Sequence, residues 1–222
     1  MTVNDILSQL KALHNKSTFA HNLKDGANSN NQFGVKLGDV RTLAKKLKAS
    51  NELALELWKT FYLEARLIAI LLMEPKSLSA IQMEDLAKTL DFVQVADWFN
   101  AYVLKKFPQN EQFTHEWMSA ANIWLARSGW SLLAEQLTKK SADINGKELL
   151  TRIENEMPKA APQVQWTMNT ALAQLGIHYP EYRNQALALG EKLGIYRDYP
   201  VSKGCTSPFA PIWINEMVKR QK

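Results

Sequence analysis

Apolar residues recur every three or four positions along nearly the whole chain, and no stretch alternates apolar with polar residues for long. A spacing of three and four places side chains on one face of an α-helix, whereas a strand needs a period of two. Glycine and proline interrupt these segments at short intervals. The sequence therefore predicts an all-α fold of short helices with short connections.

The spacing and the cap residues together define the predicted helices. Thr2 and Asp39 are predicted N-caps, and Gly176 and Gly194 are placed where C-caps belong. The helix over 61–73 is the most apolar and is predicted to be central. The predicted ranges are 3–13, 18–24, 40–47, 51–58, 61–73, 81–90, 95–106, 122–136, 147–156, 163–175 and 181–193, with one helix between 106 and 122 and a short one at the end of the chain.

The predicted helices come in pairs, and tryptophans mark a faint repeat. Trp58 and Trp98 lie 40 residues apart and Trp166 has a similar place in its helix, although Trp124 breaks the period. A period of roughly 40–47 residues is typical of HEAT-like units. We therefore expect one domain over residues 1–222, an α-α superhelix of HEAT-like or ARM-like repeats with a concave binding face.

The segment 195–222 departs from this pattern, because prolines and aromatic residues precede its short final helix. We expect an extended C-terminal tail that packs on the body of the protein. Four aromatic residues are its predicted anchors: Tyr196, Tyr199, Phe209 and Trp213. An alternative is that Lys203, beside Gly204 and Ser207, places a donor near a phosphate.

Charge and cysteine content limit the possible partners. The net charge is +5, and it is patchy: residues 1–50 hold eight Lys and Arg against three acids, whereas residues 51–100 hold four against eight. Such patches are compatible with nucleic acid. One cysteine excludes an internal disulfide, and the four histidines have no metal-ligand spacing. We expect a cytoplasmic, nucleoid-associated monomer without metal, cofactor or membrane contact, since the longest apolar tract, Leu67–Met73, is too short to cross a bilayer.

The stretch 89–137 holds the candidate site. Helical spacing places Asn100, Ala101 and Leu104 on one face with Asp97, and it groups Trp124 with Arg127 and Ser131. A carboxylate, an arginine and flat indoles suit a surface that meets an anionic partner with flat rings. Periodicity alone favours an ordinary structural role, with Trp124 in the core and Arg127 extending its stem over apolar surface.

Several of these segments resemble the AlkD-type DNA alkylation repair proteins, which are built from HEAT-like repeats. The resembling segments are FGVKLGDVRTLAKKL (33–47), LALELWKTFYLEARLIAILLM (53–73), the region 93–106 and NIWLARSGW (122–130). The resemblance implies a DNA glycosylase for N3- or N7-alkylated purines, with Asp97 as the catalytic carboxylate and Arg127 on the DNA backbone.

The sequence departs from that family at two positions of the active helix. The family's tryptophan and its first aspartate fall on Val93 and Gln94, and its second tryptophan falls near Trp166 or Asn169. Alkylated, distorted or branched duplex DNA is therefore the expected partner, bound with or without base excision, and a protein-interaction scaffold is a third possibility. The expected DNA-binding residues are Arg127, Trp124, Trp98, Asn100, Lys105, Lys106, Trp166, Asn169 and Lys203.

Overall fold

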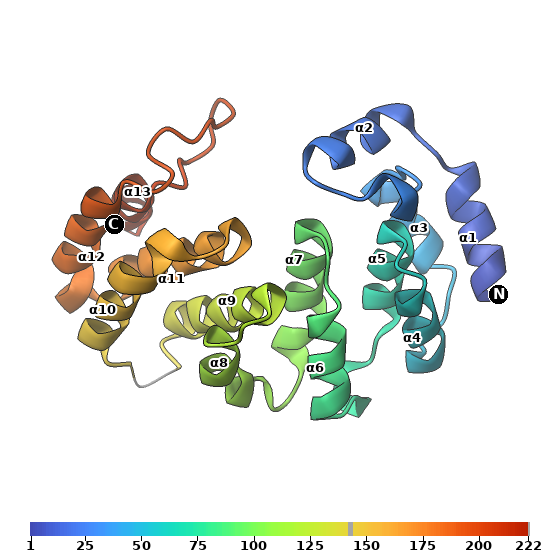
Figure 1. Ribbon diagram of the computed structural model, residues 1–222, viewed down its shortest axis with the longest axis horizontal. Coiled ribbons are helices and arrows are strands. Elements are labelled where there is room, and N and C mark those ends of the chain that lie inside the picture. Colours follow the sequence, from blue (N-terminus) through green and yellow to red (C-terminus); the bar gives the residue numbers. More distant parts are fainter. Residues whose placement is uncertain (142–143, 222) are drawn as a thin grey trace. The chain divides into compact units, whose positions relative to one another are not determined.

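The computed structural model describes residues 1–141 and 144–221, which form two compact units, Met1–Asn110 and Glu111–Lys222. Every regular element in these described ranges is helical (Figure 1), so the prediction of an all-α fold is confirmed. None of the helices in the described residues has the length and hydropathy that a bilayer crossing requires.

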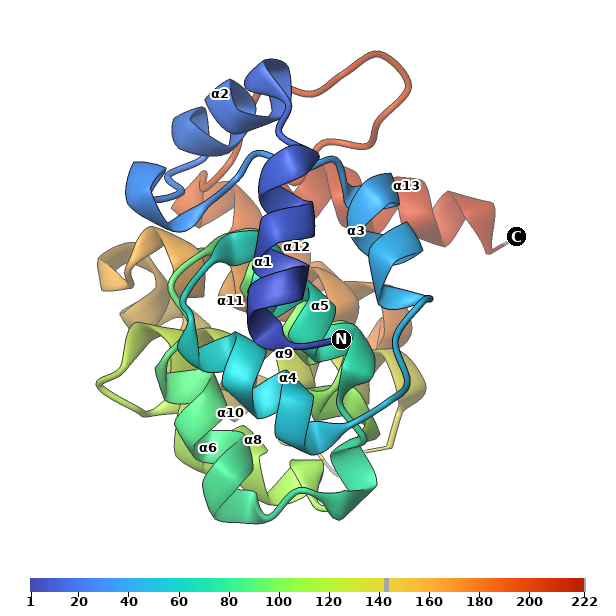
Figure 2. The same cartoon turned by 90° about the vertical axis from the view of Figure 1, so that its right-hand side faces the viewer.

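The first unit contains seven α-helices and three short 3-10 helices among its described elements. These are α1 (Val3–Ala12), α2 (Lys16–Lys24), η1 (Ser29–Asn31), α3 (Leu37–Ala44), α4 (Asn51–Lys59), α5 (Leu63–Leu72), η2 (Pro75–Ser77), α6 (Ala80–Lys88), α7 (Val93–Tyr102) and η3 (Leu104–Lys106), where η marks a 3-10 helix. Helix α5 packs against α1, α3, α4 and α7. Figure 1 shows α7 on one side of α5 with α3 and α4 on the other, and Figure 2 shows α1 in front of α4 and α5.

Helix α5 is the centre of the first unit. Nine of its ten residues are buried, including Glu64 and Arg66. An apolar helix surrounded on all sides by other helices is the expected position for such a sequence. The prediction that 61–73 forms the central helix is confirmed, but the helix begins at Leu63. Phe61 has a φ of 60°, a left-handed conformation outside the helical range.

The second unit is built around two long helices. Its elements are α8 (Asn110–Met118), α9 (Ile123–Lys139), α10 (Gly146–Glu156), η4 (Met157–Lys159), α11 (Pro162–His178), α12 (Pro180–Leu193) and α13 (Ala210–Arg220). Helices α9 and α11 lie side by side, and α10, α12 and α13 pack on α11. The core between them includes Trp130, Met168, Leu172 and Ile214, each at most 1% exposed.

The predicted helix starts were correct at Thr2 and wrong at Asp39. Thr2 accepts from the Asp5 amide and the Asp5 carboxylate accepts in return, which forms a capping box. Helix α3 begins two residues before Asp39, after Lys36, and Asp39 lies in its first turn. An acidic residue is favourable at either position, because both lie at the positive end of the helix dipole. The sequence pattern could not separate the two positions.

The predicted helix ends were correct at Gly194 and wrong at Gly176. Gly194 ends α12 with a φ of 64°, a conformation that costs glycine little. Gly176 instead lies inside α11, which continues to His178. A Cβ atom at position 176 would lie 2.6 Å from Cδ1 of Ile214. Gly176 is therefore a position of close approach to α13.

Candidate nucleic-acid interface

The motifs that carry the family resemblance hold the connections of the first unit together. Glu64 is fully buried, and its carboxylate accepts hydrogen bonds from the backbone amides of Phe33 (2.9 Å), Gly34 (2.7 Å) and Val35 (3.0 Å). Gly34 has a φ of 71°, and a Cβ there would lie 2.5 Å from Cβ of Phe19. The Phe-Gly-Val segment is thus fixed to α5 by a carboxylate that an apolar side chain could not replace.

Arg66, two residues further along α5, performs a similar role. Its Nη1 donates to the carbonyl of Thr89 (2.7 Å) and to the carboxylate of Asp91 (2.9 Å), both in the connection that leads into α7. Its guanidinium carbon lies 4.7 Å from the ring centroid of Trp58 and 4.1 Å from that of Phe61. Arg66 therefore positions the start of α7.

The Arg66–Asp91 ion pair is half exposed, because Arg66 is buried while the Asp91 side chain is 43% exposed. Partial burial raises the pKa of Asp91 above its usual value, and the opposing effect of the neighbouring guanidinium is smaller. Burial likewise lowers the pKa of Arg66, although Asp91 opposes this. For both groups, burial therefore shifts the pKa more than the charge of the partner does. This indicates that the ion pair positions the connection more than it stabilises the fold.

Helix α7 carries the predicted catalytic residue. Asp97 and Ala101 are exposed, as is Val93 one turn earlier. The prediction that Asn100 and Leu104 share this exposed face is wrong, since their side chains are 4% and 0% exposed. Asn100 and Ala101 lie on opposite sides of Asp97 around the helix, and the boundary of the buried side falls between them. Leu104 lies beyond the end of α7, in η3.

Arg41, Trp98, Tyr102 and Lys106 form a cation–aromatic cluster on the first unit, called here the Arg41 cluster. The Arg41 guanidinium carbon lies 4.3 Å from the Trp98 ring centroid, and Arg41 Nη2 is 3.5 Å from the Tyr102 hydroxyl. Lys106 Nζ lies 5.8 Å from the Tyr102 ring centroid. Arg41 and Lys106 are both exposed. The cluster therefore presents two cations whose positions are set by aromatic rings.

The Arg41 cluster changes the role expected of Trp98. That indole is 9% exposed, with Arg41 over its face and Tyr102 beside it at a centroid distance of 5.4 Å. Trp98 and Lys106 were predicted from the sequence as DNA-binding residues, whereas Arg41 and Tyr102 were not. Arg41 lies inside the resembling segment 33–47, and this was the available signal. Lys105, the remaining candidate of the first unit, is partly exposed, and its carbonyl accepts from Asn110 Nδ2.

In the second unit, Trp124 and Arg127 lie at the start of α9, which Asn122 caps through the amides of Trp124 and Leu125. Trp124 is partly exposed, whereas Arg127 is 1% exposed. Arg127 Nη1 donates to the carbonyl of Gln163 (2.7 Å) in the first turn of α11. Arg127 therefore holds α9 and α11 together in the structure, and its contact with DNA stays a prediction. The substitution Arg127→Ala tests folding as well as binding.

Trp166 and Asn169 of α11 both contact the segment between α12 and α13. The Trp166 ring lies 5.2 Å from the ring of Tyr196 and 5.7 Å from that of Tyr199. Asn169 is 2% exposed, and its Nδ2 donates to the carbonyl of Pro208 (2.8 Å). The tail is therefore packed on the body, as predicted. Phe209 is a buried anchor, but the side chain of Tyr199 is not, because it is 46% exposed.

Cys205 and Lys203 are both exposed in the same segment. We expect Cys205→Ser to leave DNA binding and any base release unchanged, since a reactive thiol needs a neighbouring base or cation to stabilise its thiolate. Binding and excision assays on the purified variant check this. Loss of either activity with an unchanged melting temperature would contradict it.

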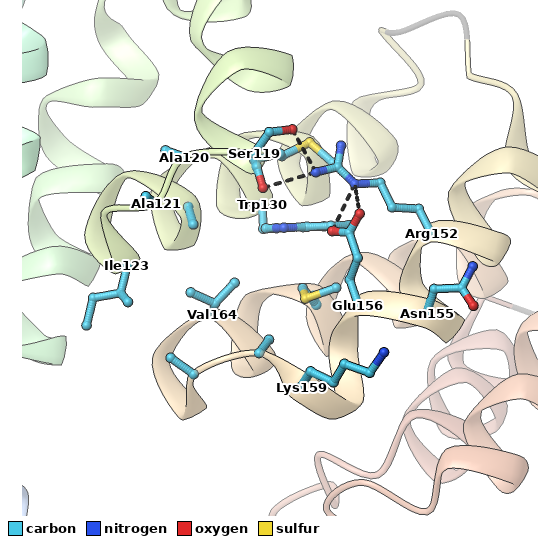
Figure 3. Close-up of a pocket in the computed structure, with 15 residues that line it drawn as sticks. Ser119, Ala120, Ala121, Ile123, Trp130, Arg152, Asn155, Glu156, Lys159 and Val164 are labelled. Atoms are coloured by element: carbon cyan, nitrogen blue, oxygen red, sulfur yellow. Dashed lines mark hydrogen bonds and ion pairs between the residues drawn. The ribbon is translucent and has the colours of Figure 1, made fainter.

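A cavity of about 570 Å³ lies elsewhere on the second unit, and none of the predicted site residues lines it. Arg152 lies at this cavity and donates to Glu156 (2.9 Å), the carbonyl of Met118 (3.1 Å) and the Ser119 hydroxyl (3.0 Å), as Figure 3 shows. Its guanidinium carbon is 5.3 Å from the Trp130 ring centroid. The charge of Arg152 is thus matched by Glu156, and we assign this cavity no role in binding an anionic partner.

The described residues contain no group of three or more side chains of the kinds that hold a metal ion. The candidate residues of the first unit are therefore the exposed carboxylate of Asp97 and the Arg41 cluster, and those of the second unit are aromatic and polar side chains on α9, α11 and the tail. Exposed cations held against aromatic rings, on an all-helical scaffold, are compatible with contacts to an anionic polymer.

Comparison with known proteins identifies the family. The family model described as DNA alkylation repair enzyme matches residues 6–201, and the chain belongs to this family. No curated protein sequence matches the chain. A solved structure described as "A new family of proteins related to the HEAT-like repeat DNA glycosylases with affinity for branched DNA structures" is similar, with a TM-score of 0.79 and 22% identity. The match covers 100% of this chain and 95% of that one, so the two proteins share a fold, and it resembles that of the HEAT-like repeat DNA glycosylases.

Proposed function

We propose that this protein binds DNA and prefers branched or distorted structures to regular duplex. The observation that carries the proposal is the Arg41 cluster, in which Arg41 and Lys106 are exposed over the rings of Trp98 and Tyr102. Cations held in fixed positions contact phosphates at a smaller entropic cost than mobile lysines do. The similar protein described as having affinity for branched DNA supports the choice of DNA structure.

Excision of N3- or N7-alkylated purines is a second candidate, and the exposed Asp97 on α7 favours it. Such a base is cationic and already a good leaving group, so a single carboxylate that stabilises the oxocarbenium-like sugar can be sufficient. The same helix argues for the first candidate. Val93, one turn before Asp97, is exposed and aliphatic, and Trp98 lies under Arg41, so neither position offers an open aromatic face to a cationic base.

Asp97→Asn separates the two candidates, because it keeps the shape of the side chain and removes its charge. If the protein is a glycosylase, the variant should lose roughly 100- to 1,000-fold in the rate of N7-methylguanine release, the usual effect of one electrostatic group at the transition state. Its affinity for DNA should stay equal or rise slightly. Asp85→Asn, at an exposed acid on α6, is the matched control. Tight binding without base release by the wild-type protein would leave DNA binding as the function.

The Arg41 cluster gives a second test, by electrophoretic mobility shift on a four-way junction, a fork and a duplex. Arg41→Ala should weaken binding by about 1–3 kcal/mol and reduce the slope of log K against log salt by about 1. Lys59→Ala, an exposed lysine on α4, is the control and should have a smaller effect. An unchanged salt slope in Arg41→Ala would contradict the assignment of this cluster to phosphate binding.

A further inference from the structure

The segment between α12 and α13, residues 195–209, is called here the tail loop, and both of its ends are firmly held. At its start, Arg197 Nη2 donates to the carbonyl and the carboxylate of Glu191 (2.9 Å each), and the Arg197 guanidinium lies 4.6 Å from the Phe209 ring centroid. At its end, Pro208 accepts from Asn169 and Phe209 is 3% exposed. The loop is therefore a built element with a fixed base.

The middle of the tail loop makes a tight turn into solvent. The amide of Cys205 donates to the carbonyl of Ser202 (3.0 Å), and Gly204 in this turn has a φ of 85°. All residues from Tyr199 to Cys205 are exposed, and Val201 is 45% exposed. Figures 1 and 2 show the loop projecting beyond the helices of its own unit. Val201 keeps much of its apolar surface in water, so it contributes less to folding than a buried valine would.

A three-ring cluster supports the loop at its base. The ring centroids of Trp166, Tyr196 and Tyr199 lie 5.2 to 5.7 Å apart, in edge-to-face and tilted arrangements. Burial raises the pKa of Tyr196, which marks it as the inner member. Tyr196 also has a φ of 63°, a left-handed conformation that surrounding contacts must hold in a non-glycine residue. Tyr199 thus presents an exposed ring whose inner edge is fixed.

We infer that Tyr199 and Val201 form an apolar wedge that stacks on an unpaired base at the branch point of DNA. An aromatic ring fixed from behind stacks on a base at little entropic cost, and apolar side chains inserted at base steps are a known mode of contact with deformed DNA. Lys203, two residues beyond Val201, is exposed and adds a cation for a flanking phosphate. This inference rests on the proposed function and adds to it the group that recognises the branch.

The charge of the tail loop favours nucleic acid over an acidic or neutral protein surface only modestly. Arg197 and Lys203 are its cationic side chains, and Asp198 is its anionic one. The stronger argument is the combination of a half-exposed ring, a neighbouring aliphatic tip and a cation within five residues. An unpaired nucleotide can meet all three groups: its base stacks on the ring and makes an apolar contact with the aliphatic tip, and its phosphate lies by the cation.

The test uses a DNA fork with 2-aminopurine at the unpaired position of the branch and a fully paired duplex of the same length. The wild-type protein should change the 2-aminopurine fluorescence on binding. Tyr199→Ala and Tyr199→Leu should each lose this change and weaken fork binding about five- to hundredfold, with duplex affinity within about twofold of wild type. Tyr199→Phe keeps the ring and should behave as wild type. Ile212→Ala, an exposed apolar residue of α13, is the matched control.

The outcomes separate this inference from the proposed function. Fork binding by Tyr199→Ala and Tyr199→Leu at wild-type strength would overturn the wedge and leave DNA binding intact. Equal losses on fork and duplex would also overturn it, because the loop would then contact only the backbone. If the wild-type protein binds none of the DNA structures, the proposed function itself fails. The melting temperature of each variant confirms that the fold is retained.

Discussion

A chain that ends at Gly194 is expected to be recovered as insoluble or partly unfolded protein. The truncation removes Phe209, Ala210 and Ile214, which are 3%, 1% and 0% exposed, and uncovers the faces of α11 and α12 on which α13 packs. Loss of a buried Phe or Ile side chain costs about 2–5 kcal/mol each. Two such losses approach the whole stability of a typical domain, about 5–15 kcal/mol. Soluble yield and a circular dichroism melt measure the effect.

Two neighbouring isoleucines of α13 test the same idea without deletion. Ile214→Ala should lower the free energy of unfolding by about 2–5 kcal/mol, since the side chain is fully buried against Gly176. Ile212→Ala, two residues earlier and 44% exposed, should change it by no more than about 0.5 kcal/mol. A truncated chain that melts as the full chain does, yet fails to bind DNA, would make the tail a binding element with no structural role.

Glu64→Gln is expected to lower the free energy of unfolding by roughly 3 kcal/mol. The Glu64 carboxylate accepts from three backbone amides, and a glutamine offers one oxygen and one NH₂ group in its place. Whichever way the glutamine amide is turned, its NH₂ group faces at least one of these three backbone N–H groups, so two hydrogen-bond donors face each other. Hydrogen bonds to a charged group contribute about 1.5–3 kcal/mol, and a buried unsatisfied donor costs about 1–3 kcal/mol.

Urea denaturation followed by circular dichroism measures this loss. Glu56→Gln is the matched control, because Glu56 is an exposed acid on the neighbouring helix α4. The environment of the stacked Phe33 and Tyr62 rings, whose centroids lie 4.5 Å apart, should also change in Glu64→Gln. A denaturation midpoint equal to that of Glu56→Gln would show that the three amides find other partners and that Glu64 is not required for the connection.

The helices were predictable because their signals are local. Apolar spacing of three and four, the Thr2 capping box and the glycine at 194 act within a few residues of where they lie in the sequence. The errors came where two local interpretations have the same sequence pattern. An aspartate is favourable both before α3 and in its first turn, and a glycine near the end of α11 is compatible with a cap or with close packing on Ile214.

The site was less predictable, because its contacts join residues far apart in the sequence. The pairing of Arg41 with Trp98 spans 57 positions, and periodicity within α7 could not show that Arg41 covers the indole. Arg127 was expected on a surface by helical spacing, but its partner, the carbonyl of Gln163, lies in another helix. The resemblance selected Asp97 on α7 without deciding which of its neighbours are exposed.

The exposed thiol of Cys205 allows the position of the tail loop on bound DNA to be measured in solution. Cys205 is the single cysteine of the sequence, so a maleimide fluorophore attaches at one known position, in the turn that follows Val201 and contains Lys203. Resonance energy transfer from that dye to another at a chosen nucleotide then reports the separation of the turn from each arm of a junction. The wild-type chain itself is therefore suitable for single-molecule experiments that follow docking and release in real time.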